Sequence, residues 1–396
     1  MLFVAVALGL GIPRPAIAQD ANLTKSPPAM VFAPWQEVAR TDDGIEYLES
    51  FPSPYPSGIA VNDTVPLRVF LPLTQRPADA VLILHYWGAT DIKLERALAQ
   101  ELNQRGIAAA VMTLPYHLAR TPAGYRSGEL AVQPDPTRLI QTMTQCVQDG
   151  RRAIDFLATR PEIRMNRLGI SGTSLGAVVT ALLSAVDTRI TDASFLLGGA
   201  DIAHILWSSS RTVPQRDALR RKGFSEESLR QYLQPIEPLD YLQSHRPGSS
   251  FVIGANFDTV VPRVSSEKLI SALGTENVLW LDTGHYGGIF VERRLMREIA
   301  KYFAAEFTGN TFEPPDRLYA PTVRLGFKID TASGLDIGIG LDLFKFDRRG
   351  TTFSSVLLTP RGPQVFLGRK LSSGISLGAF GSTRGAGLGL LWSTVL

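Results

Sequence analysis

The stretch RLGISGTSLGAVVTALLSA, Arg167 to Ala185, decides the fold. A short apolar run leads into GTSLG, residues 172–176, and a long run of small, helix-compatible residues follows. This order predicts a strand, a sharp turn and a helix, with Ser174 projecting from the carboxyl end of a sheet. Gly172 and Gly176 are expected to let strand and helix approach closely, because a side chain at either position would meet neighbouring backbone.

The composition is that of a globular protein. The chain has 396 residues, 44% of them hydrophobic and 19% charged, enough for one large domain and a smaller unit. The net charge of +3 is spread over residues of both signs, without a basic run or a basic stripe interleaved with aromatics. The sequence therefore argues against nucleic acid as the partner.

The N-terminus carries the pattern of a signal peptide over residues 1–18. The apolar run Leu2–Ile12 is too short to span a bilayer, and Ala16-Ile17-Ala18 matches the small-x-small cleavage pattern. We expect export to the periplasm or the medium, with outer-membrane association as a further option. Because no lysine or arginine precedes the apolar run, the alternatives are a true start that lies upstream and a buried N-terminal strand.

Cys146 is the only cysteine, so the chain forms no internal disulfide and no cysteine-rich zinc site. Its flanks have a helical period, which predicts a buried, small apolar side chain rather than a nucleophile.

Short apolar runs alternate with longer helical patterns from Ile45 onward. The predicted strands are 45–51, 65–70, 80–84, 107–113, 167–171, 193–197, 251–254 and 278–281. The predicted helices are 92–104, 138–159, 175–186, 265–273 and 292–307. Their alternation predicts an α/β domain over residues 19–312, with a mostly parallel sheet and helices on both faces. Residues 203–250 break the rhythm and predict a helical cap, with Ser225 capping one helix.

Residues 318–396 predict a separate antiparallel β unit of about six strands. Apolar residues alternate strictly, as in Val323, Leu325, Phe327 and Ile329, and glycine-rich turns separate the runs. The unit is interpreted as a small soluble domain, a sheet docked on the α/β domain, or a surface for membrane or homo-oligomer contact. Because six strands are fewer than in the smallest usual membrane barrel, the membrane interpretation requires added strands or oligomerisation.

A reactive serine needs a base and an acid nearby. His285 follows the last strand of the sheet and Asp258 follows the strand before it, so both are expected at the carboxyl end beside Ser174. We predict His285 as general base and Asp258 as the acid. Asp282 and Asp201 are rival acids; the side chain of Asp282, close to its strand, would point more easily into the flank of the sheet.

The other four histidines are assigned lesser roles. His85 is expected to support its loop by hydrogen bonding, and His117 to line the pocket. His204 and His245 fall in the cap region, where a surface or structural role is expected.

From about Ile45 to Phe307 the chain resembles the α/β-hydrolases. The motifs that carry the resemblance are the elbow GTSLG, the acid loop NFDTVVP and the histidine loop DTGHYGG, in the order that this fold uses. More faintly, the chain resembles dienelactone hydrolases and acetyl-xylan-type esterases.

The Leu175 amide, at the predicted helix start, is expected to stabilise an oxyanion. The resemblance implies a second donor after the third strand, where family members commonly carry His-Gly. This chain reads His85-Tyr86-Trp87-Gly88 there, with tyrosine in place of the glycine. The second donor is assigned to the Trp87 amide, with Tyr86 as the neighbouring alternative.

The implied chemistry is hydrolysis of an ester-like substrate through an acyl-enzyme, with no metal or cofactor. The alternatives are a glycine-rich turn with an incidental serine and a catalytically silent binding protein of the same fold. Lipid, sugar ester, polyester and lactone substrates all stay open, and a peptide is less favoured. In the cap, residues 204–207 (HILW) with Trp207 form either an apolar pocket wall or packing against the sheet.

Overall fold

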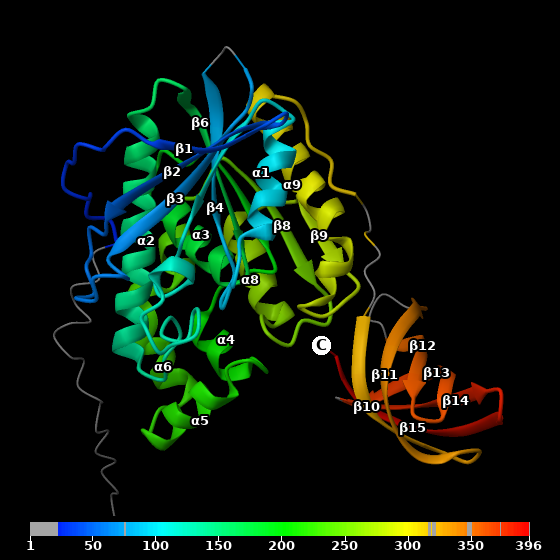
Figure 1. Ribbon diagram of the computed structural model, residues 1–396. Helices are drawn as coiled ribbons and strands as arrows, with labels where there is room; N and C mark the ends of the chain where they lie inside the picture. Colours follow the sequence, from blue (N-terminus) through cyan, green and yellow to red (C-terminus); the bar gives the residue numbers. More distant parts are fainter. Residues whose placement is uncertain are drawn as a thin grey trace, which may run out of the picture.

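A computed structural model describes residues 23–74, 77–315, 318, 322–346, 351–372 and 374–395. The expected signal peptide at residues 1–18 lies outside the described residues. The chain forms an α/β domain and, beside it, a β-barrel (Figure 1).

The α/β domain is built on one nine-stranded sheet with the order β1-β2-β3-β5-β4-β6-β7-β8-β9. Its strands are β1 (Gln36–Thr41), β2 (Gly44–Pro52), β3 (Thr64–Leu71), β4 (Ala78–Leu84), β5 (Ala108–Met112), β6 (Ile163–Thr173), β7 (Asp192–Leu196), β8 (Ser249–Ala255) and β9 (Val278–Leu281). Strands β4 to β9 pair in parallel, whereas β1, β2 and β3 add antiparallel pairs at one edge. Only β1 was not predicted, because its six residues are all exposed and carry no apolar alternation.

Helices cover both faces of the sheet, as the sequence predicted. They are α1 (Lys93–Asn103), α2 (Pro136–Ala158), α3 (Leu175–Val186), α4 (Ile202–Ser208), α5 (Val213–Arg221), α6 (Glu226–Leu233), α7 (Pro238–Leu242), α8 (Arg263–Leu273) and α9 (Glu292–Thr308). Helices α1 and α9 pack on one face, and α2, α3 and α8 pack on the other. Within the described ranges, none of the helices has both the length and the apolarity needed to cross a membrane.

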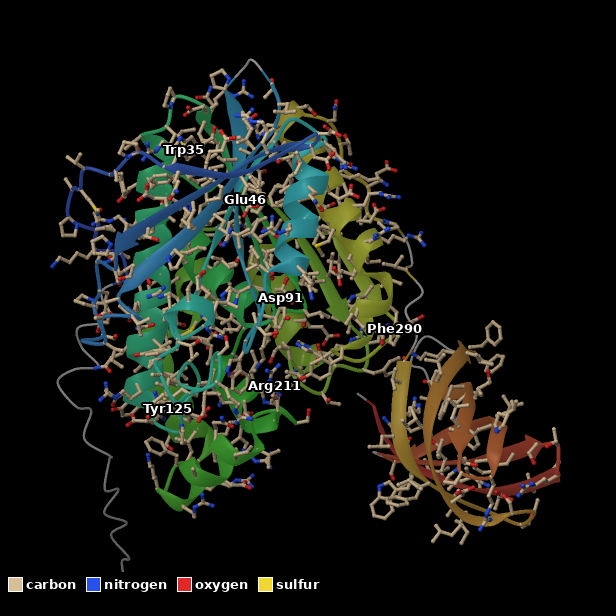
Figure 2. All side chains as sticks on the ribbon, viewed as in Figure 1. Trp35, Glu46, Asp91, Tyr125, Arg211 and Phe290 are labelled. Carbon is tan, nitrogen blue, oxygen red and sulfur yellow. The ribbon has the colours of Figure 1, made fainter. Side chains whose placement is uncertain are left out.

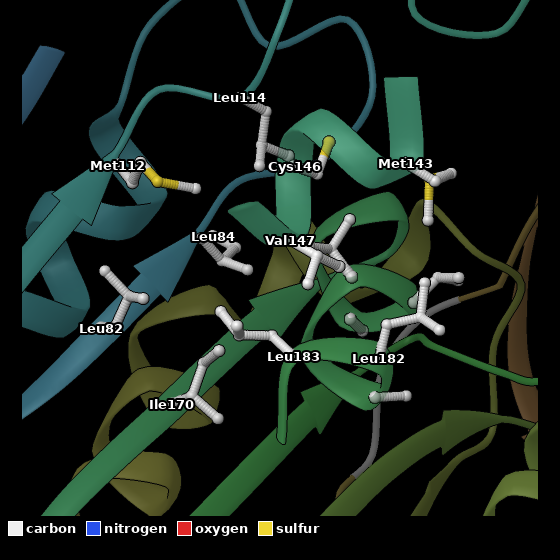
Figure 3. Packing of buried hydrophobic residues seen from close by; sticks show 14 of the residues in the cluster. Leu82, Leu84, Met112, Leu114, Met143, Cys146, Val147, Ile170, Leu182 and Leu183 are labelled. Atoms are coloured by element: carbon white, nitrogen blue, oxygen red, sulfur yellow. The ribbon is translucent and has the colours of Figure 1, made fainter. Parts of the chain in front are cut away.

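Parallel strands buried on both faces explain the continuous apolar runs in the sequence. Along β4, Leu82 and Leu84 contribute to one core cluster and Val81 and Ile83 to the other. Figure 3 shows the first cluster, where side chains of α2 and α3 pack over the sheet. Cys146 of α2 lies in this core as a buried thiol, as predicted, and burial raises its pKa.

Helices α4 to α7 lie between β7 and β8 in the chain. Helices α4, α5 and α6 form the cap at the carboxyl end of the sheet (Figure 1), whereas α7 packs against α3 and α8. Ser225 caps α6 as predicted, because its hydroxyl accepts a hydrogen bond from the Ser228 amide at 3.1 Å.

The C-terminal unit is a closed antiparallel barrel of six strands in sequential order. The strands are β10 (Thr322–Asp330), β11 (Gly334–Lys345), β12 (Thr352–Thr359), β13 (Gly362–Ser372), β14 (Ile375–Ser382) and β15 (Gly385–Val395). Closure leaves no open sheet edge, because β15 pairs with β10. At the junction with the α/β domain, the Thr322 hydroxyl donates to the Asp282 carbonyl at 2.7 Å, and the Lys345 ammonium lies 4.1 Å from the ring centre of Phe257.

Candidate active site

Ser174 occupies a strained turn between β6 and α3. Its φ of 54° and ψ of −113° are unusual for a residue with a side chain, and its amide donates to the Leu196 carbonyl at 2.8 Å. A Cβ at Gly172 would collide with the Gly176 carbonyl, and one at Gly176 would collide with backbone at the end of β4. Glycine at both positions is therefore a packing requirement of this turn.

The structure brings the three predicted side chains together at the carboxyl end of the sheet. His285 Nε2 lies 3.0 Å from Ser174 Oγ, and His285 Nδ1 lies 2.7 Å from Asp258 Oδ2. Because the carboxylate only accepts, the imidazole proton is on Nδ1, and Nε2 accepts from the serine hydroxyl. All three side chains are buried or nearly so, with Ser174 and His285 each 7% exposed.

The carboxylate of Asp258 is fixed by the backbone that follows it. Its Oδ1 accepts hydrogen bonds from the amides of Val260 and Val261, both at 2.8 Å. The other oxygen is thereby turned toward His285.

The two rival acids have other partners. Asp282 accepts a hydrogen bond from the Asn256 side chain at 2.8 Å. Asp201 accepts from the Arg230 guanidinium, and its Oδ2 lies 2.5 Å from the Lys268 ammonium. The two ring nitrogens of His285 are engaged by Asp258 and Ser174.

The two predicted oxyanion donors, Leu175 and Trp87, line one cavity together with Ser174. Leu175 is the first residue of α3, so its amide has no acceptor within the helix. Trp87 lies in the loop after β4, and its indole donates to the Gly128 carbonyl at 2.8 Å. Arg211 lies where the cap meets this loop (Figure 2); it donates to the Trp87 carbonyl at 2.9 Å and stacks 4.5 Å from the Trp87 ring.

His85 and His117 form a buried pair beneath the Trp87 loop, with ring centres 4.8 Å apart. Burial lowers the pKa of His85 to about 4 and that of His117 to about 3. Neutral rings can accept as well as donate: His85 Nε2 accepts from the Leu114 amide, and His117 Nε2 accepts from the Gly88 amide, both at 3.0 Å. His85 supports its loop as predicted.

The predicted pocket role of His117 is wrong. It lines neither cavity at Ser174, because its ring is turned inward beneath the loop, where Nδ1 lies 2.8 Å from the Pro115 carbonyl. Its place in the loop after β5 was the only sequence signal for its supporting role.

Two cavities meet at Ser174. The larger, about 430 Å³, is lined mainly by apolar and aromatic side chains, among them Tyr86, Leu197, Tyr286 and Ile289, and also by His285.

The smaller cavity, about 80 Å³, lies under the cap and is lined by Trp87, Leu175, Met143 and Leu206 among others. The predicted cap wall is therefore made by Leu206 and its neighbour Ile205. Trp207 instead packs under Arg220, whose guanidinium lies 4.9 Å from the centre of the Trp207 ring.

Among the described residues, no group of three or more His, Cys, Asp or Glu side chains is arranged to hold a metal ion. Besides Ser174 and His285, the larger cavity is lined by the charged residues Asp91, Lys93, Arg211 and Glu292.

The strand order, with the serine turn between β6 and α3, is that of the α/β-hydrolase fold, as the sequence resemblance implied. An acetyl xylan esterase from Paenibacillus sp. R4 is similar to this chain with a TM-score of 0.52 and 17% identity, over 68% of this chain and 88% of its own. Acetyl xylan esterase 1 from Thermoanaerobacterium sp. JW/SL YS485 gives 0.51 and 14% identity, over 67% and 87%. No family model and no curated protein sequence matches the chain.

Proposed function

We propose that the protein is a serine hydrolase that cleaves a carboxylic ester. The observation that carries the proposal is the continuous hydrogen-bonded chain from Ser174 Oγ through His285 to Asp258. The esterase activity named for the two solved structures of this fold agrees with it.

In the proposed reaction, Ser174 Oγ attacks the ester carbonyl while its proton passes to His285 Nε2. Asp258 stabilises the resulting imidazolium through Nδ1. The amides of Leu175 and Trp87 donate to the oxyanion, and His285 then gives its proton to the departing alcohol. Water attacks the acyl-enzyme by the same route and releases the acid and free Ser174.

The two cavities support an assignment of the two halves of the ester. The leaving oxygen must lie within reach of His285 Nε2, and His285 lines only the larger of the two cavities at Ser174. The alcohol is therefore assigned to the cavity of about 430 Å³ and the acyl group to the cavity of about 80 Å³. We propose esters of a short acyl group with a larger, mainly apolar alcohol.

A fluorophosphonate probe tests the enzyme against the alternative of a silent binding protein. We expect covalent labelling of the intact protein, loss of labelling and of ester hydrolysis in Ser174→Ala, and retention of both in Ser208→Ala, an exposed serine of the cap. An unlabelled protein that still folds would refute the serine mechanism.

We also propose export, on the sequence of residues 1–18. Fractionation of the native host is expected to yield a mature chain that begins at Gln19 outside the cytoplasm. A chain that retains residues 1–18 in the cytoplasm would refute it.

A further inference from the structure

The polarity of the C-terminal barrel is inverted relative to a soluble β domain. Its three described acidic residues, Asp330, Asp336 and Asp342, are buried inside, together with the basic residues Arg324 and Lys328. Arg324 pairs with Asp342 at 2.8 Å, and Lys328 pairs with Asp330. The interior thus holds ion pairs together with an apolar cluster that includes Phe353 and Phe366, and the Arg324 guanidinium lies 4.2 Å from the centre of the Phe353 ring.

The outer face is apolar on every strand. Each of the six strands presents an outward apolar side chain that is between 47% and 66% exposed. In strand order these residues are Phe327, Ile337, Leu358, Leu367, Leu377 and Leu388. We call this surface the apolar belt. A soluble monomer rarely exposes such a continuous surface, and here it runs right round the barrel.

Exposed charges on the described part of the barrel are confined to its two ends and are all basic. Arg361 and Arg384 lie in the turns at one end, and Arg369 and Lys370 lie near the end of β13 at the other. The exposed Trp392 lies near this second end, where its β14 neighbour is the first residue of that strand.

We propose that the barrel is embedded in a lipid bilayer with anionic headgroups. The apolar belt faces the hydrocarbon, and the basic ends match the negative headgroups. The strands have 8 to 12 residues, close to the roughly 9 to 11 that cross a bilayer when tilted. Closure of the six-stranded barrel pairs its backbone groups internally, which the bilayer interior demands, so the added strands or oligomerisation that the sequence led us to expect are not needed.

A bilayer explains the belt better than a second copy of the chain. A dimer interface covers one face of a barrel, whereas apolar residues are exposed on all six strands. Because side chains fill the interior, the barrel is an anchor for the α/β domain and not a pore.

The test reconstitutes the full chain with vesicles of phosphatidylcholine and phosphatidylglycerol, followed by flotation. We expect the protein to float with the vesicles and to resist extraction by high salt and by alkaline carbonate. The double variant Ile337→Lys/Leu388→Lys is expected to lose membrane partitioning by at least about tenfold, because each lysine places a charge in hydrocarbon. The matched control Ile59→Lys, on an exposed site of the α/β domain, is expected to float like the wild type.

A second measurement reports on the belt without altering it. We expect brominated lipids to quench the tryptophan fluorescence of the wild type. In Trp392→Phe this quenching is expected to be weaker. Release of the wild type by salt alone would overturn the proposal, as would a soluble oligomer that ignores vesicles. Fluorophosphonate labelling of Ser174 checks that the double variant has folded; Ser174→Ala is expected to float unchanged, which keeps this test separate from the proposed catalysis.

Discussion

The amide of Gly88 donates to Nε2 of His117 at 3.0 Å and so ties the loop after β4 to the loop after β5. The peptide between Trp87 and Gly88 is held at both ends, since its carbonyl accepts from Arg211 at 2.9 Å. The proposed second oxyanion donor therefore depends on residues from two other segments of the chain.

His117→Ala removes the acceptor for the Gly88 amide. We expect kcat to fall about a hundredfold with little change in KM, because the oxyanion is bound only after attack. His117→Gln retains an acceptor and is expected to recover part of the rate. His204→Ala, in the cap, is the control, and equal losses in both alanine variants would contradict the assignment.

Arg211→Met removes the cap contact to the Trp87 carbonyl. Displacement of the loop is expected to lower kcat about tenfold. Arg211→Lys keeps a hydrogen-bond donor and is expected to retain most of the wild-type kcat. Arg220→Met is a matched control, because Arg220 stacks on Trp207 at 4.9 Å as Arg211 stacks on Trp87 at 4.5 Å. Steady-state kinetics on one ester distinguishes the three variants.

Leu206→Ala enlarges the proposed acyl cavity. We expect the ratio of kcat/KM for hexanoate over acetate esters to rise about tenfold, since each accommodated methylene contributes to binding. Leu94→Ala, in the larger cavity, should leave that ratio unchanged. A shift with Leu94→Ala instead would reverse the assignment of acyl and alcohol sides.

Glu95 of α1 is buried, and neither carboxylate oxygen has a hydrogen-bond partner among the described residues. Burial raises its pKa from 4.5 to about 7. Because the pKa of Glu95 is higher in the folded than in the unfolded protein, the stabilisation from its protonated carboxyl is complete below pH 4.5 and is lost as the pH rises through about 7.

Glu95→Gln is therefore expected to raise the free energy of unfolding by about 3 kcal/mol in mild alkali and by little in acid. Urea unfolding at both pH values measures this. Glu101→Gln is the control, because Glu101 already pairs with Arg105 at 2.9 Å. An equal gain at both pH values would show that charge is not the cause.

The buried side chains of His85 and His117 are expected to make the stability of the folded protein sensitive to acid. Their pKa values fall from 6.5 to about 4 and about 3, so the unfolded chain binds protons before the folded chain does. Their contribution is complete above pH 6.5 and is lost as the pH falls from there toward 3. As the pH falls, the urea midpoint of the double variant His85→Gln/His117→Gln should decrease less steeply than that of the wild type. The control His204→Gln should keep the wild-type dependence on pH.

Each strand and helix of the predicted α/β pattern has a counterpart in the structure, because its signals are local. Apolar runs, glycines and the elbow each constrain the backbone around them. His285 and Asp258 were found for a related reason: in a parallel sheet, residues that directly follow neighbouring strands share one edge. Strand β1 gave no such signal, because its exposed residues show no apolar alternation. The role of His117 gave none because it depends on the Gly88 amide, which is distant in the chain.

The sequence by itself determined the α/β order, the strained turn at Ser174 and the alternating strands of the C-terminal unit, because these follow from spacing along the chain. Alternation does not say which face of a strand is inside. Only closure of the barrel decided that Arg324 and Asp342 pair within it while Phe327 and Leu388 face outward. The physical reason is that a buried charge needs a partner, and β10 and β11 bring that partner only when they pair in this register.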